Sequence, residues 1–169
     1  MEKLGQATIE VGRAPPPFAG WARALLALAP LLLGGCGSSL MNARVDVRSR
    51  DWELAVRSVM DGPNSVFVQQ YRYVPDDGGR FLHVFVTLRN VGAQRRKWNW
   101  ARCGLDLGDR QYLPTRVLYD IVLSAPAADV LELDPNEEVE RRIIFTYPED
   151  ALPARLTCGE LVVPLHLRS

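Results

Sequence analysis

The chain has 169 residues, which is enough for one domain of ordinary size and a short additional segment. Hydrophobic residues make up 47% of the chain and charged residues 24%, which excludes a disordered or collagen-like chain. Lysine and arginine together number 20, as do aspartate and glutamate, so no net charge favours nucleic acid or an anionic surface. With only two histidines and three cysteines, we expect no metal-rich site and no cofactor.

An uncharged apolar run of ten residues extends from Ala24 to Leu33, and three basic residues precede it. The run is too short for a membrane-spanning helix, which needs about 20 residues, and it matches the apolar part of a signal peptide. It ends in Leu33-Gly34-Gly35-Cys36, which resembles the lipobox of bacterial lipoproteins. The resemblance implies cleavage before Cys36 and attachment of lipid to its thiol. The alternative is a buried helix that ends at the glycines, with Cys36 an ordinary core residue.

The resemblance implies a mature protein held by fatty acids such as palmitate to the bacterial cell envelope, outside the cytoplasm. Gly37 stands where an aspartate would signal retention at the inner membrane, so the outer membrane is favoured. We therefore divide the chain into a signal peptide (residues 1–35), a lipidated cysteine with its tether (36–50) and a folded domain (51–169).

The folded domain has the alternation of apolar and polar residues that is typical of strands. Strands are predicted at residues 52–56, 65–74, 80–91, 103–107, 138–147 and 161–167, and residues 114–130 are ambiguous. Asn136 is expected in a tight turn, where it tolerates a positive φ. Pro164 lacks a backbone N–H, so the last strand is expected at a sheet edge or to be bulged. About seven short strands and no convincing amphipathic helix predict an all-β fold, an antiparallel β-sandwich.

Several short segments resemble one known domain. They are "FVTLRN" (85–90), "CGLDLGDRQYLP" (103–114), "LELDPNEEVERRIIFTYPED" (131–150) and "LVVPLHL" (161–167). Together they resemble the immunoglobulin-like, telokin-like extracellular domain of uncharacterised bacterial lipoproteins, over about residues 52–167. The chain departs from that pattern at Asn136, where glycine is usual, and at Asp109-Arg110 in the middle turn. The resemblance brings no catalytic residues, so we expect no enzyme.

Two cysteines remain in the domain once Cys36 is acylated. Cys103 and Cys158 form an even pair in an oxidising compartment, which predicts a disulfide. Two buried thiols or a redox pair are the alternatives. A redox pair is disfavoured because the chain has no C-x-x-C motif.

The segment 94–102 interleaves cations with tryptophans and is the candidate partner-binding site. Its candidate residues are Arg95, Arg96, Lys97, Trp98, Trp100 and Arg102. Charge and stacking of this kind can bind anionic lipid headgroups, polyanionic glycans or nucleic acid. We do not expect nucleic acid, because an anchored protein outside the cytoplasm rarely meets it. The alternative is a solvated hairpin end whose tryptophans pack on the sandwich, with arginines stacked over them.

Other candidate sites are weak. His83 and His166 would need neighbouring strands and further ligands to hold a metal, so ordinary histidines are the interpretation. The acidic residues at 76–77 and 132–138 lack the spacing of a calcium loop, which favours a role in turns. No serine lies in a G-x-S-x-G context.

The sequence favours a lipid-anchored binding or structural module without catalysis. Its contacts with a protein or an envelope polymer are expected at sheet edges and at the segment 95–102. The alternative is a small-ligand or metal carrier that uses a cleft between the two sheets. A hollow pocket would indicate the carrier, and a solid core the binding module.

Overall fold

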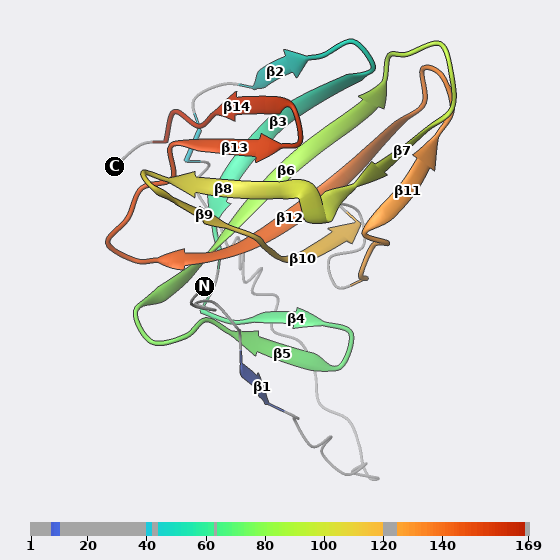
Figure 1. Cartoon of the computed structure of the whole chain (residues 1–169). Helices are drawn as coiled ribbons and strands as arrows, with labels where there is room; N and C mark the ends of the chain where they lie inside the picture. The colour runs from blue at the N-terminus through green and yellow to red at the C-terminus, as the bar shows by residue number, and fades with distance from the viewer. Residues whose placement is uncertain (1–7, 11–39, 42–43, 63, 120–124, 168–169) are drawn as a thin grey trace, which may run out of the picture.

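The structure, a computed structural model, describes residues 8–10, 40–41, 44–62, 64–119 and 125–167 (Figure 1). Cys36 lies outside the described residues, as does all of the predicted signal peptide except residues 8–10. Among the described residues, no helix has the length and apolar character that crossing a membrane requires. The elements are β1 (Thr8–Glu10), β2 (Val45–Arg48), β3 (Trp52–Asp61), β4 (Val66–Val68), β5 (Tyr71–Val74), β6 (Gly79–Asn90), β7 (Arg96–Asn99), the 3-10 helix η1 (Trp100–Arg102), β8 (Cys103–Leu107), β9 (Arg110–Tyr112), β10 (Pro114–Tyr119), β11 (Val130–Leu133), β12 (Glu138–Pro148), β13 (Arg155–Cys158) and β14 (Leu161–Pro164).

Two antiparallel sheets form an immunoglobulin-like β-sandwich. The first sheet has the order β10-β12-β6-β3-β2, and the second has the order β14-β13-β8-β9. The strands β3, β6, β12 and β10 occupy the places of A, B, E and D in the immunoglobulin arrangement, and β9, β8, β13 and β14 those of C′, C, F and G. The predicted fold class is thus confirmed. Beyond these strands the chain adds β2 at one edge and short peripheral strands outside the two sheets.

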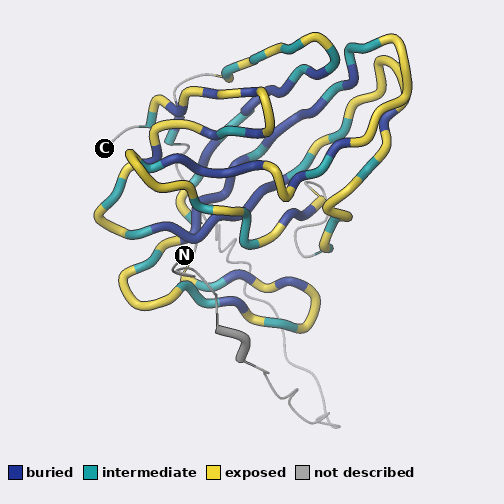
Figure 2. Tube along the Cα trace, viewed as in Figure 1, coloured by how far each residue is buried: buried dark blue, intermediate teal, exposed yellow. Residues whose placement is uncertain are grey.

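The core lies between the two sheets and is built by the alternation that the sequence predicted. On β6, the inward residues Leu82, Val84 and Leu88 are fully buried. Leu105 and Leu156 face them from the second sheet and belong to the same apolar cluster. Figure 2 shows the buried residues along the central strands of the sandwich. Burial of this kind contributes about 1.5–3 kcal/mol for each large apolar side chain.

The segment 65–74 is a hairpin, whereas a single strand was predicted. β4 and β5 pair with each other, and Gln69 in the turn between them has a φ of 55°. Gln69 and Gln70 occupy the turn of the hairpin, which interrupts the alternation of apolar and polar residues in this segment. The hairpin packs on the outer side of the first sheet. The contact forms a second apolar cluster. The hairpin contributes Val66, Val68 and Tyr73 to it, and the sheet contributes Phe81, Leu118 and Ile144.

The folded domain includes part of the predicted tether, so the boundary at residue 51 is wrong. β2 pairs with β3, and the backbone N–H of Leu40 donates to the carbonyl of Val59 at 2.7 Å. Met41 is buried and forms an isolated bridge with Leu167. The sequence signal for β2 was weak, because the alternation of apolar and polar residues extends over only four positions.

The remaining strands match the predictions in part. Asn136 has a φ of 65°, which confirms the predicted turn. β14 lies at the edge of its sheet and ends at Pro164, as expected for a strand that contains proline. The ambiguous region begins with β10, while β7, β11 and β13 were not predicted. β1, in the predicted signal peptide, pairs with β5.

Candidate functional site

The segment 94–102 forms part of a two-stranded ribbon, β7–β11, at one end of the sandwich (Figure 1). This is the end at which β6 stops and β3 starts, since Asn90 pairs with Trp52. The buried amide of Asn90 ties the ribbon to the sheet. Its Nδ2 donates to the carbonyl of Leu133 at 2.9 Å and to that of Gln94 at 2.8 Å.

Trp98 and Trp100 pack inside the protein, which corrects the expectation that their rings take part in a surface contact. Trp98 is 7% exposed and Trp100 is 0% exposed. Trp98 meets Trp52 and Trp100 edge to face, with ring centroids 5.0 Å and 5.7 Å apart. Burial of large rings in such pairs outweighs any gain from exposing them. The structure shows the alternative, in which the tryptophans pack on the sandwich. The arginines that were expected to stack on these rings do not do so among the described residues, where arginine guanidinium groups stack on Tyr73 and Tyr119 instead.

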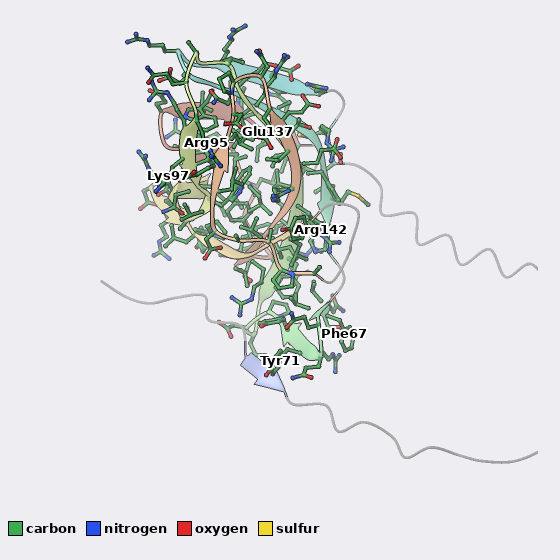
Figure 3. The ribbon with its side chains drawn as sticks, turned by 90° about the vertical axis from the view of Figure 1, so that its right-hand side faces the viewer. Phe67, Tyr71, Arg95, Lys97, Glu137 and Arg142 are labelled. Carbon is green, nitrogen blue, oxygen red and sulfur yellow. A yellow bond between two sulfur atoms is a disulfide. The ribbon has the colours of Figure 1, made fainter. Side chains whose placement is uncertain are left out.

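The cations of the segment lie at the surface among carboxylates. Arg95 approaches Glu132 at 3.2 Å and Asp134 at 3.6 Å, and Lys97 approaches Glu132 at 3.2 Å. Figure 3 shows Arg95 and Lys97 on the same part of the molecule. Exposed ion pairs of this kind contribute at most about 1 kcal/mol each. The ribbon therefore presents a surface of mixed charge, where the sequence alone suggested a basic one.

The other two cations differ in their surroundings. Arg96 approaches Asp51 at 3.2 Å, beside the start of β3. Arg102, the last residue of η1, is exposed and has no ion pair among the described residues. Its position is fixed by the turn that begins at Asn99, whose Oδ1 accepts a hydrogen bond from the Ala101 N–H at 2.9 Å. Arg102 is therefore available to an anionic group.

A depression of about 220 Å³ lies beside β7, and we call it the β7 depression. Its lining residues are Trp52, Lys97, Trp98, Asn99, Arg102, Gly159 and Glu160. The indole Nε1 of Trp98 is buried and has no hydrogen-bond partner within the described part of the chain. Lys97 and Arg102 both line the depression, so a carboxylate or phosphate group could bind there through charge-assisted hydrogen bonds. The volume is below the range of about 300–1,000 Å³ that is usual for small-molecule sites.

The predicted disulfide between Cys103 and Cys158 is present. The two residues lie directly opposite each other on β8 and β13, with Cα atoms 3.9 Å apart, and both are fully buried. Cys103 follows η1 immediately, and Gly159 accompanies Cys158 in the turn that lines the β7 depression. The disulfide therefore joins two segments that shape the depression.

The two histidines are not neighbours in a sheet, since His83 lies on β6 and His166 lies beyond the end of β14. His83 is buried on the outer side of β6, and a Cβ at Gly62 would come within 2.8 Å of its Nε2. Burial, and next the positive charge of Arg142, lowers the pKa of His83 to about 4, so the ring is neutral near pH 7. His166 is exposed beyond β14. Within the described part of the chain, no three His, Cys, Asp or Glu side chains lie together so that they could hold a metal ion.

The acidic residues near 132–138 act in the ribbon and its turn. Glu137 Oε2 accepts a hydrogen bond from the Asp134 N–H at 2.7 Å and so closes the turn that contains Asn136. The pairing of Glu132 with Lys97 across the ribbon was missed in the sequence. The only signal was the presence of an acidic and a basic segment, because 35 positions separate the two residues.

Comparisons with known proteins show similarity to solved structures alone. No protein-family model and no curated protein matches the chain. A candidate lipoprotein of Bacillus subtilis is 14% identical with a TM-score of 0.46, over 66% of this chain and 31% of its own length. An uncharacterised β-sandwich protein of Clostridium difficile is 16% identical with a TM-score of 0.48, over 69% of this chain and 85% of its own. A conserved hypothetical protein of Bacillus anthracis is 14% identical with a TM-score of 0.49, over 76% of this chain and 99% of its own. At these identities the likeness is one of fold.

Proposed function

We propose that the protein is a lipid-anchored binding module of the bacterial cell envelope, and that it holds a protein or an envelope polymer without catalysis. The observation that carries the proposal is the β7 depression, which the cations Lys97 and Arg102 line beside the ring of the buried Trp98. The buried tryptophans hold this strand in place, so the polar groups are positioned before a partner arrives. Preorganised groups bind more tightly because less side-chain freedom is lost.

The anchor is proposed from the sequence. A ten-residue apolar run and the Leu33-Gly34-Gly35-Cys36 motif support cleavage and lipidation at Cys36. The resemblance of residues 52–167 to the telokin-like domain of bacterial lipoproteins supports the same location. Gly37 favours the outer membrane. Two or three acyl chains give a stable anchor, because each buried CH₂ contributes about 0.8 kcal/mol.

Catalysis forms no part of the proposal, because the residues that line the β7 depression include no serine, threonine, cysteine or histidine. The core of the described domain gives no support to a carrier with a cleft between the sheets. The space between the two sheets is occupied by an apolar cluster that contains residues of both. A solid core of this kind supports a module that binds through its surface.

Charge reversal at the depression tests the proposal. Photocrosslinking in intact envelopes should trap a partner near β7, and Lys97→Glu with Arg102→Glu should lower the yield about tenfold, which corresponds to about 1.4 kcal/mol. The loss is expected because charge-assisted hydrogen bonds to both cations disappear. The crosslinked species is measured by immunoblot and mass spectrometry.

The matched control carries the same change of charge on exposed arginines away from the ribbon, as Arg80→Glu with Arg110→Glu. Circular dichroism confirms that both double variants are folded. An equal yield from both, or no crosslinked species with the wild-type protein, contradicts a partner at the β7 depression.

A further inference from the structure

The chain enters the sandwich at the end opposite the β7 depression. Leu40 lies along the free edge of β3, where its N–H donates to the carbonyl of Val59, and it continues the antiparallel pairing of β2 with β3. The segment from Leu40 through β2 runs antiparallel to β3. Its N-terminal part therefore lies beside the C-terminal end of β3, at Asp61. β3 has ten residues from Trp52 to Asp61, which corresponds to about 33 Å. The entry of the chain and the β7 depression are therefore separated by most of the length of the sandwich.

The lipid anchor that we propose leaves little chain between the membrane and this end. Cys36 lies four residues before Leu40. Four residues reach at most about 14 Å even when fully extended. An acylated Cys36 must lie at the bilayer surface, so the Asp61 end of the sandwich is held against the membrane.

The element at that end is the hairpin β4–β5, which follows β3 directly. Phe67, between two buried valines, points away from the sandwich and is 59% exposed. Arg72 lies opposite it on β5 and is also exposed. Figure 3 shows Phe67 and Tyr71 at the end of the molecule that is remote from Arg95 and Lys97.

The face of the hairpin opposite Phe67 packs on the first sheet. Tyr73 packs on the outer side of the first sheet, its hydroxyl accepts a hydrogen bond from Arg116 Nη2 at 2.8 Å, and the guanidinium lies 4.6 Å from its ring centroid. β1, which pairs with β5, belongs to the predicted signal peptide. The cluster that holds the hairpin consists of residues beyond Cys36, so it remains after cleavage.

We infer that the hairpin β4–β5 docks on the phospholipid surface, with Phe67 inserted at the boundary of headgroups and acyl chains. The inference rests on the proposed lipid anchor. Aromatic side chains favour the membrane interface, and arginine is attracted to lipid phosphates. The carboxylates of Asp76 and Asp77 lie beyond the other end of β5, away from the Gln69-Gln70 turn, and stay in water. Docking fixes the orientation of the domain, so that the β7 depression faces away from the membrane.

Tryptophan fluorescence in lipid vesicles tests this orientation. Phe67→Trp is made in the acylated mature protein, which contains only the buried Trp52, Trp98 and Trp100 once residues 1–35 are removed. The protein is reconstituted in phosphatidylethanolamine–phosphatidylglycerol vesicles whose acyl chains carry bromine. We expect at least about twofold quenching of the introduced tryptophan, because bromine quenches indole only on close approach.

The control is Val130→Trp, on β11 at the other end of the sandwich, where the native side chain is 51% exposed. Its fluorescence should be the same with and without bromine. If the protein floats with the vesicles and the Phe67→Trp variant is quenched no more than the Val130→Trp variant, the docking of the hairpin is refuted while the anchor stands. If the protein isolated from cells is not acylated and does not float, the anchor itself fails, and the inference fails with it.

Discussion

Replacing Trp100 by alanine lowers the free energy of unfolding by about 3–5 kcal/mol. The ring is fully buried and packs edge to face on Trp98, so its removal leaves a cavity between η1 and the sandwich. The loss is measured by urea denaturation, as a lower midpoint with an unchanged dependence on urea.

The neighbouring variant Lys97→Ala is the control, because this exposed side chain contributes a surface ion pair with Glu132 and no apolar packing in the core. Its free energy of unfolding should stay within about 0.5 kcal/mol of the wild-type value. A loss equally small for Trp100→Ala would contradict the buried tryptophan cluster. The rings would then have to be exposed, and they would again be candidates for direct contact with a partner.

Reduction of the disulfide lowers the free energy of unfolding by about 4 kcal/mol, the value that chain entropy gives for a separation of 55 residues. The cross-link limits the freedom of the unfolded chain, and both cysteines lie in the core of the second sheet. The urea midpoint of the wild-type protein should fall when dithiothreitol is present. Cys103→Ala with Cys158→Ala is the matched control, since its midpoint should not respond to the reductant.

The number of free thiols checks the disulfide directly. Thiol titration of the unfolded mature domain, made without Cys36, should find no free thiol before reduction and two afterwards. Two free thiols before reduction, together with a midpoint that dithiothreitol leaves unchanged, would show that Cys103 and Cys158 are not joined.

Long strands were predictable because their alternation persists over many residues. β6 and β12 place a run of apolar side chains on one face over most of their length, which chance seldom produces. Asn136 was predictable for a different reason, since proline before it favours a turn and asparagine tolerates a positive φ. The disulfide followed from the number of cysteines and the expected compartment, not from the strands.

The ribbon β7–β11 and the hairpin β4–β5 were not predictable from local pattern. Each has strands of three or four residues, too few for alternation to show. The ribbon joins Lys97 to Glu132 across 35 positions, and no local signal records such a pairing. Short strands of this kind are stabilised by the sheets on which they pack.

The candidate site was found by its unusual composition, but the direction of its side chains was not predicted. Trp98 and Trp100 are two positions apart, as are Arg95 and Lys97. Side chains two apart in an extended segment share a face, so period two would place both tryptophans together, opposite Arg95 and Lys97. Burial of the large apolar rings then leaves the cations outside, and the structure has this arrangement.

The two ends of the sandwich thus have different characters. The Asp61 end receives the chain from the proposed anchor and carries the aromatic hairpin. The opposite end carries the tryptophan-supported ribbon and the β7 depression. A module that is tied at one end and binds at the other keeps its partner within a fixed distance of the membrane. This proposed division of roles depends on the lipid that we propose at Cys36.

The most direct test of that dependence is the intact mass of the native protein extracted from membranes of its own cells. We expect a chain that begins at Cys36 and carries the added mass of diacylglycerol, with or without a third acyl chain. Cys36→Ser should abolish the added mass and leave an uncleaved precursor. A native protein that retains residues 1–35 with an unmodified Cys36 would contradict the anchor, and with it the location and the function proposed for the domain.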